Sequence, residues 1–240
     1  MDGIVIKRRN TQKIDDKEME ACIMKRTAVK ILDDLVRRRS ELGPCAGELR
    51  AAFDLLAAGF AGGGKLLVCG NGGSAADAEH IVGELMKGFL LRRPLDAGRL
   101  AALERTVPGD WRAFAASLQL ALPAIALTGH PSLTTAFAND VAADMVFAQQ
   151  VLGYGKEGDV FLGISTSGSS RNVLNAALAA KAFGLRVLAL TGNSGGSLAG
   201  LADVCIRAPE RETYLVQEAH ESLYHALCAA LEEESFGAPD

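Results

Sequence analysis

The feature that most constrains this chain is a short apolar run followed by a glycine turn and a helical pattern. Residues 66–69 read Leu-Leu-Val-Cys, which is typical of a buried strand. The glycine-rich segment 70–73 allows a tight turn, and we expect Ser74 to cap a helix over 75–85, with Asp77 in the capping-box position. A strand, turn and helix in this order point backbone N–H groups at an anion. An ordinary tight turn remains open, because neither a dinucleotide nor a nucleoside-triphosphate fingerprint is present.

The same succession of apolar runs and helical patterns recurs along the chain. Strands are predicted over residues 66–69, 124–127, 159–164, 186–190 and 204–207. Helices are predicted over residues 15–39, 45–60, 75–85, 139–152, 171–183 and 213–234. Because strands alternate with helices, we expect an α/β fold whose five-stranded parallel sheet is covered on both faces. Ligands of such folds bind at the carboxyl ends of the strands.

Residues 91–122 interrupt this alternation. Breaks at Arg92-Arg93-Pro94 and Pro108-Gly109-Asp110 separate two helical pieces, the second of which carries the single tryptophan. We interpret the segment as a helical insertion. The predicted organisation is an N-terminal helical arm over residues 1–44 and a domain over 45–240 that contains the insertion. The two helices before the first strand either cover a sheet face or form a subunit contact, and both interpretations stay open.

Composition excludes several classes of function. The 240 residues carry a net charge of −4 without a large basic block, so a nucleic-acid ligand is disfavoured. No apolar stretch is long enough to cross a membrane, and the first residues lack the apolar core of a signal peptide. Five cysteines, an odd number, form no C-x-x-C pair. They are typical of buried thiols, which favours a cytoplasmic location.

Hydroxyl side chains are concentrated directly after the third predicted strand. Ser165, Thr166, Ser167 and Ser170 precede a helix, where hydroxyls, backbone N–H groups and the helix dipole can hold a phosphate without lysine. A turn that caps its own helix is the alternative, but this density of hydroxyls favours phosphate binding. The loop over 191–196 is rich in glycine and has fewer hydroxyls, so we assign it a structural role.

Two helices carry side chains that suit a metal ion or acid–base chemistry. His80 and Glu84 lie four residues apart, and Gln217, Glu221 and His225 follow one stripe of the last helix. Imidazole, carboxylate and amide oxygen are ordinary zinc ligands, and the first two are ordinary general acids and bases. A structural role is the preferred interpretation for the other candidates His130, His220 and Cys228.

These motifs together resemble the sugar-isomerase (SIS) domain family, and more narrowly its phosphoheptose isomerase branch. The resemblance extends from about residue 45 to the last helix and implies a flavodoxin-like αβα sandwich. It also implies a homotetramer, a zinc cofactor, and conversion of sedoheptulose 7-phosphate to D-glycero-D-manno-heptose 7-phosphate. The implied catalytic residues are Glu84 and His225. The implied zinc ligands are His80, Glu84, Gln217 and His225. The implied substrate-binding residues are Asn71, Gly72, Gly73, Ser74, Asp140, Ser165, Thr166, Ser167, Ser170 and Gln217.

The chain departs from the family pattern at three places. Gly88, with Lys87 beside it, stands where enterobacterial members carry an arginine. Tyr214, three residues before Gln217, stands where the family pattern has an aspartate that contacts the sugar. The insertion over 91–122 is absent from short members. A non-catalytic SIS protein is the alternative, either one that binds a replication initiator or a regulator that senses sugar phosphates. The presence of all four implied zinc-site residues favours the enzyme.

Overall fold

The computed structural model describes residues 25–239. The first predicted helix is therefore seen only from Arg26, and its part over 15–24 lies outside the described residues. The helices are α1 (Arg26–Arg38), α2 (Ala46–Ala61), α3 (Gly73–Met86), α4 (Ala97–Thr106), α5 (Trp111–Ala116), α6 (Pro131–Phe137), α7 (Val146–Tyr154), α8 (Arg171–Ala182), α9 (Gly196–Ala199) and α10 (Thr213–Phe236). Shorter 3₁₀ or π segments are η1 (Ser40–Cys45), η2 (Ala138–Ala142) and η3 (Ala143–Met145).

All strands of the described sheet are parallel, as the sequence predicts. The strands are β1 (Leu66–Cys69), β2 (Ala124–Ala126), β3 (Val160–Ser165), β4 (Arg186–Thr191) and β5 (Val204–Arg207). Their order is β2-β1-β3-β4-β5, with Leu66 opposite both Ala124 and Val160. The chain leaves β1 toward one edge of the sheet and β3 toward the other. The order therefore reverses between β1 and β3, which is where ligands bind in flavodoxin-like folds.

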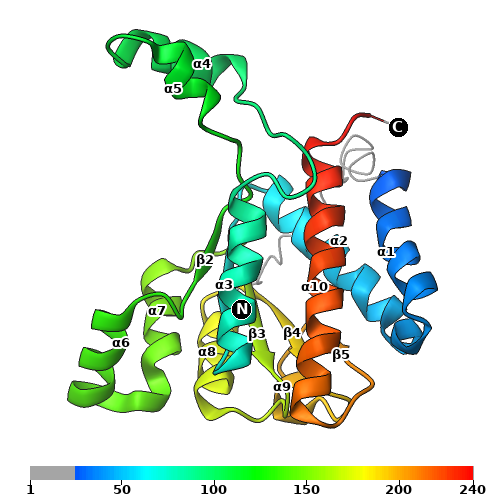
Figure 1. The fold of residues 1–240 in the computed structure, drawn as a ribbon. Coiled ribbons are helices and arrows are strands. Elements are labelled where there is room, and N and C mark those ends of the chain that lie inside the picture. Colours follow the sequence, from blue (N-terminus) through cyan, green and yellow to red (C-terminus); the bar gives the residue numbers. More distant parts are fainter. Residues whose placement is uncertain (1–24, 240) are drawn as a thin grey trace, which may run out of the picture.

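Helices cover both faces of this sheet and complete the expected αβα sandwich (Figure 1). On one face, α2, α3 and α10 pack against alternate strand residues such as Val68 and Leu162, and buried residues of α1 join the same core. On the other face, α7, α8 and α9 pack against the intervening residues such as Leu67 and Phe161. The two faces thus have separate cores, as expected for parallel strands that are buried on both sides. Within residues 25–239, none of the helices has the length and apolarity that crossing a bilayer requires.

Two local predictions are wrong. Ser74 does not cap the first sheet-connected helix, because Gly72, at a φ of 56°, allows α3 to begin at Gly73. The single helix predicted over 139–152 is divided. Backbone at Ala142 is extended (φ −162°, ψ 121°), so a π segment ends there and α7 starts only at Val146. The sequence analysis also missed α6, which Pro131 opens at a position that tolerates its absent N–H group.

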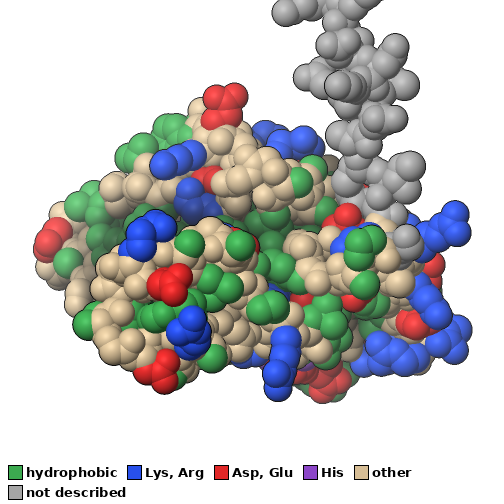
Figure 2. Space-filling model, turned by 90° about the horizontal axis from the view of Figure 1, so that it is seen from above, with side chains coloured by type: hydrophobic (Ala, Val, Ile, Leu, Met, Phe, Trp, Pro, Cys, Tyr) green, Lys and Arg blue, Asp and Glu red, His purple; other side chains and the backbone are tan. Residues whose placement is uncertain are grey.

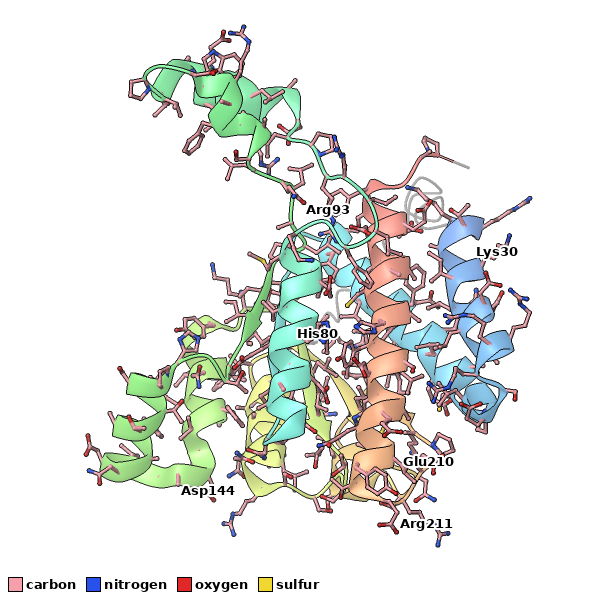
Figure 3. The ribbon with its side chains drawn as sticks, in the orientation of Figure 1. Lys30, His80, Arg93, Asp144, Glu210 and Arg211 are labelled. Atoms are coloured by element: carbon pink, nitrogen blue, oxygen red, sulfur yellow. The ribbon has the colours of Figure 1, made fainter. Side chains whose placement is uncertain are left out.

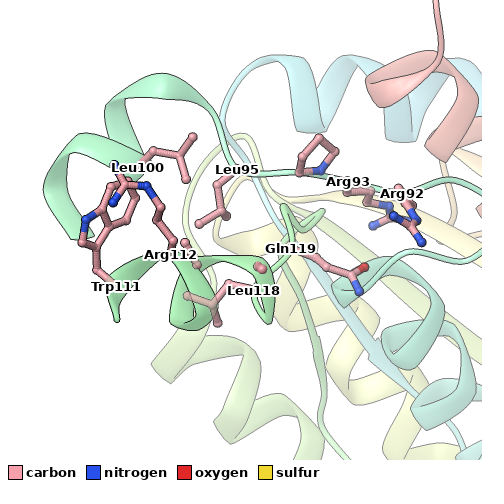
Figure 4. Close-up of a pocket in the computed structure, with 11 residues that line it drawn as sticks. Arg92, Arg93, Leu95, Leu100, Trp111, Arg112, Leu118 and Gln119 are labelled. Carbon is pink, nitrogen blue, oxygen red and sulfur yellow. The ribbon is translucent and has the colours of Figure 1, made fainter. Parts of the chain in front are cut away.

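The insertion is a pair of short helices, here called the α4–α5 hairpin (residues 91–122), that projects from one end of the sandwich (Figure 1). Asp96 and Asp110 cap its helices by accepting hydrogen bonds from backbone N–H groups. Hydrophobic and charged side chains are interspersed over this end of the molecule (Figure 2). A cavity of about 670 Å³ lies at the base of the hairpin, and Figure 4 shows apolar Leu95, Leu100 and Trp111 in its lining.

Candidate active site

The candidate active site lies in the seam between α3 and α10. Figure 3 shows His80 on the side of α3 that faces α10. Glu84, four residues later, lies on the same side of the helix. His225 reaches the same point from α10, with its Nε2 atom 3.4 Å from Nε2 of His80. The Nε2 atom of His80 is also 3.3 Å from Oε1 of Glu84. Residues 145 positions apart in the chain therefore form one acid–base cluster.

Tyr224 fixes the orientation of the His80 ring in this cluster. Its buried hydroxyl lies 2.9 Å from Nδ1 of His80, so the other ring nitrogen of that histidine faces Glu84 and His225. Tyr224 also lies beside Asp77 on α3. Burial, reinforced by the negative charge of Glu221, raises the pKa of Asp77 to about 6. Burial, reinforced by neighbouring His80, lowers the pKa of His225, which favours a neutral imidazole near pH 7.

The cluster has the donor chemistry of a zinc site. Ligand atoms of His80, Glu221 and His225 all lie within 4.8 Å of one another. Two imidazoles and a carboxylate at this separation fit a zinc ion. Glu221 is not among the implied zinc ligands, but it lies on the same helical stripe as His225, and that spacing is the signal that identifies it as a candidate.

Gln217, the fourth residue of the implied zinc set, lies at the other end of α3. A Cβ atom added to Gly73 would sit 2.4 Å from Nε2 of Gln217, so the amide packs directly on the glycine turn. The structure thus brings His80, Glu84 and His225 together and places Gln217 beside the start of α3.

A lysine stands beside the carboxylate of this cluster. Nζ of Lys87 is 3.1 Å from Oε2 of Glu84. In the sequence, Lys87 stood out only as the neighbour of Gly88. The backbone N–H of Gly88 donates to Gln119, at the exit of the α4–α5 hairpin. Lys87, the residue directly before Gly88, therefore supplies the positive charge next to Glu84.

The hydroxyl-rich loop 165–170 follows β3, at the carboxyl edge of the sheet. Buried Ser165 and half-buried Ser170 have their hydroxyl oxygens 3.1 Å apart, and α8 begins directly afterwards. Gly168, at a φ of 64°, packs on the 191–196 loop, and a Cβ atom there would lie 2.1 Å from the carbonyl oxygen of Gly195. Loop 191–196 therefore supports the hydroxyl loop, in keeping with the structural role assigned to it.

The glycine turn and the hydroxyl loop are tied to each other across the reversal point of the sheet. Asn71 and Asn172 exchange two amide hydrogen bonds of 2.9 Å, which link the turn after β1 to the first turn of α8. Asp140 lies in η2, where its exposed carboxylate accepts from the amide of Asn139. His220 is buried, and its Nε2 atom lies 3.1 Å from the carbonyl oxygen of Thr191, as expected of a structural histidine.

Comparison with known proteins agrees with this architecture. Residues 34–110 and 110–192 match the SIS domain model. The phosphoheptose isomerase of Thiobacillus denitrificans is 43% identical over 189 residues, which is 78% of this chain and 83% of that protein. The phosphoheptose isomerase of Rhodospirillum rubrum is 38% identical over 80% of this chain and 88% of that protein.

The solved structures lead to the same group. A phosphoheptose isomerase from Neisseria gonorrhoeae superposes with a TM-score of 0.66 at 34% identity, covering 84% of this chain and 94% of that one. A phosphoheptose isomerase from Francisella tularensis superposes with a TM-score of 0.64 at 30% identity. The chain belongs to the SIS domain family. Within that family, its place is in the phosphoheptose isomerase branch.

Proposed function

We propose that this protein is an aldose–ketose isomerase that converts sedoheptulose 7-phosphate to D-glycero-D-manno-heptose 7-phosphate. The observation that carries the proposal is the convergence of Glu84 and His225 on His80 in the α3–α10 seam, at 3.3 and 3.4 Å. The similarity to phosphoheptose isomerases over most of the chain supports this sugar as the substrate.

The reaction needs one group to move a proton between C1 and C2, and another to serve the oxygens O1 and O2. The carboxylate of Glu84 suits the carbon-bound proton, and the neutral imidazole of His225 can give and take a proton at the oxygens. Both act on a cis-enediol, so no redox cofactor is required. Loop 165–170 would hold the phosphate at the other end of the open-chain sugar, and this fixed position would supply much of the rate.

The proposed cofactor is zinc, held by His80, Glu84 and His225, with Glu221 as an additional candidate ligand. Gln217 is the fourth ligand that the resemblance implies, and it would have to move from the glycine turn to reach the ion. The close approach of the two imidazoles and the flanking carboxylates support it. When bound, zinc would act as a Lewis acid on the sugar oxygens. Glu84 and His225 would then orient the sugar and move protons from positions fixed by α3 and α10.

The remaining parts of the proposal concern assembly and location. We propose a homotetramer with active sites near subunit contacts, since enzymes of this type form closed, symmetric oligomers. We propose a cytoplasmic location, which the free thiols of Cys45, Cys69, Cys205 and Cys228 support.

Substitution of the two proton-transfer residues tests the reaction. Glu84→Gln and His225→Gln should each lower kcat by about 10²- to 10⁴-fold, because a general acid or base contributes on that scale. His130→Gln is the matched control, because His130 precedes α6 away from the seam, and it should keep wild-type activity. Metal content should be measured alongside, since glutamine remains a weak ligand.

Isotope exchange tests the enediol. Turnover in heavy water should place deuterium at C2 of the aldose product. Wild-type rates in Glu84→Gln, or the absence of deuterium when exchange with solvent is allowed, would contradict the mechanism. An inactive wild-type protein would favour the non-catalytic alternative.

A further inference from the structure

A fully buried ion pair joins the ends of the two helices that carry the candidate active site. Arg93, at the start of the α4–α5 hairpin, lies 2.7 Å from Glu232 of α10 through its Nε atom. Both side chains have no exposed surface. Figure 3 shows Arg93 at the top of the seam between α3 and α10, above His80. In the sequence, Arg93 stands out only as part of the break Arg92-Arg93-Pro94.

The guanidinium of Arg93 also holds the last turn of α3. Its Nη1 atom donates to the carbonyl oxygen of Leu85 at 2.6 Å, and its Nη2 atom donates to that of Glu84 at 3.1 Å. These carbonyls belong to the helix end, where the helix itself offers no partner. One planar group therefore fixes α3 with two nitrogens and α10 with the third.

Both carboxylate oxygens of Glu232 accept hydrogen bonds. Its carboxylate accepts hydrogen bonds from the backbone N–H groups of Phe89, Leu90 and Leu91 at 2.6–3.0 Å, in addition to the one from Arg93. The ring of Phe236, on the next turn of α10, lies 4.8 Å from the guanidinium carbon. The pair thus connects α3, the loop that follows it and α10 at one point.

We propose that Arg93 and Glu232 are positioning residues for the isomerase site. They fix the position of Glu84, along the axis of α3, relative to His225 on α10. The inference rests on the proposed function. A buried ion pair is weak evidence for a gain in stability, because removing both charges from water costs about as much as their attraction returns. In this pair, however, Arg93 donates a hydrogen bond directly to the backbone carbonyl of Glu84. Neither residue reaches the reacting atoms, so their effect passes through that backbone.

The position of the pair predicts a selective kinetic effect. The hydroxyl loop 165–170 joins β3 to α8, and the hydrogen bonds of the pair go to neither element. Disturbing the pair should therefore lower kcat, which depends on the spacing of Glu84 and His225. It should leave KM nearly unchanged, because KM depends mainly on the phosphate contacts. A misplacement of catalytic groups of about 1 Å can cost about 100-fold in rate.

The chain offers a matched control at the amino-terminal ends of the strands β1 and β3. Buried Asp159 accepts hydrogen bonds from the backbone N–H groups of Lys65 and Lys156, and its Oδ2 atom lies 2.5 Å from Nζ of Lys65. Asp159→Asn removes a comparable set of charge-assisted bonds before β3 begins. Loss of stability alone should therefore appear in both Asp159→Asn and Glu232→Gln.

The kinetic experiment compares Glu232→Gln, Arg93→Lys and Asp159→Asn with the wild type on sedoheptulose 7-phosphate, at a temperature well below each melting point. An amide at 232 must point its N–H₂ group at other donors, and lysine at 93 cannot hold two carbonyls and a carboxylate in one plane. We expect kcat to fall by about 10- to 100-fold in the two pair variants, with KM within about twofold. Wild-type kcat in both, or an equal loss in Asp159→Asn, would overturn the proposal.

A second readout separates this proposal from the proposed function. The chain has only four histidines, so their ring signals can be resolved by NMR in histidine-labelled protein. Glu232→Gln should shift the signals of His80 and His225 and leave that of His130 in place, and Asp159→Asn should shift none of the three. Unchanged His80 and His225 signals would refute the positioning role. An inactive wild type would refute the isomerase alone.

Discussion

Two side chains on the helices of the seam, buried His220 and half-buried Asp77, respond to pH in opposite directions. Burial lowers the pKa of His220 to about 4, against an ordinary value of 6.5. Burial and the charge of Glu221 raise the pKa of Asp77 to about 6, against 3.8. Within the buried atoms of the described residues, Nδ1 of His220 and Oδ2 of Asp77 have no hydrogen-bond partner. Neither group has a neighbour that stabilises its charged form fully.

The sign of each effect follows from which state binds more protons. As the pH falls, His220 is protonated in the unfolded state before it is protonated in the folded state. Its contribution to stability is therefore complete above pH 6.5 and is lost as the pH falls toward 4. As the pH falls, Asp77 is protonated in the folded state before it is protonated in the unfolded state. Its contribution to stability is therefore complete below about pH 4 and is lost as the pH rises through 6. In the wild type the two effects oppose each other over the same interval.

We predict that substitutions separate these effects. His220→Gln should remove a loss of roughly 3 kcal/mol between pH 6.5 and 4, at about 1.36 kcal/mol per pKa unit. Asp77→Asn should make the wild-type loss over that interval steeper. Urea unfolding in the presence of a chelator, repeated from pH 4 to 7, measures both slopes. Parallel curves for wild type and both variants would show that folding shifts the pKa of neither side chain.

At the scale of elements, the hydroxyl loop depends on one glycine. Gly168→Ala combines a positive φ with a Cβ atom 2.1 Å from the carbonyl oxygen of Gly195, so the loops 165–170 and 191–196 must separate. We expect a higher KM for the sugar phosphate and a loss of stability beyond that of its control. Gly109→Ala has a φ of 81° in open space, so it should cost about 1–2 kcal/mol and leave KM unchanged. Equal effects of the two variants on KM would contradict a phosphate role for the loop.

The strands were the most predictable elements because each is a short apolar run with a polar or glycine-rich exit. Predicted strand ends differ from the observed ones by one residue at most, as for β3 (160–165 against 159–164). Helix boundaries next to special backbone geometry were less predictable. The extended residue Ala142, which divides the expected helix over 139–152, has no signal in its side chain. Its conformation follows from tertiary packing, which propensity does not describe.

Local spacing revealed part of the site, and contacts between distant segments formed the rest. His80 and Glu84 were found because they share one helical face. The approach of His225 to His80, by contrast, depends on how α10 lies across the sheet. The pairing of Arg93 with Glu232, 139 residues apart, left no local pattern in the sequence at all.

At the scale of the whole molecule, the α4–α5 hairpin is the part that the sandwich does not need. Phe114 is 50% exposed and Leu118 is 43% exposed, so the apolar side of the hairpin is not fully packed within one chain. We predict that light scattering finds a tetramer for the full chain at micromolar concentration. Replacing residues 97–118 by a short glycine-containing linker, which retains Arg93, should change either the tetramer or KM. Full retention of both would make the hairpin a surface decoration, and a monomeric full chain would refute the homotetramer.

The late position of α10 in the chain has a consequence for synthesis. This helix supplies His225 and Glu232, and its apolar side covers one face of a sheet whose strands all precede it. While a ribosome is still translating, the nascent chain holds His80 and Glu84 without their partners, and that sheet face lies open. Domains complete their folding as units, at synthesis rates of about 5–20 residues per second. A message that ends before codon 213 therefore yields an aggregation-prone chain with no catalytic cluster, so quality control should remove it.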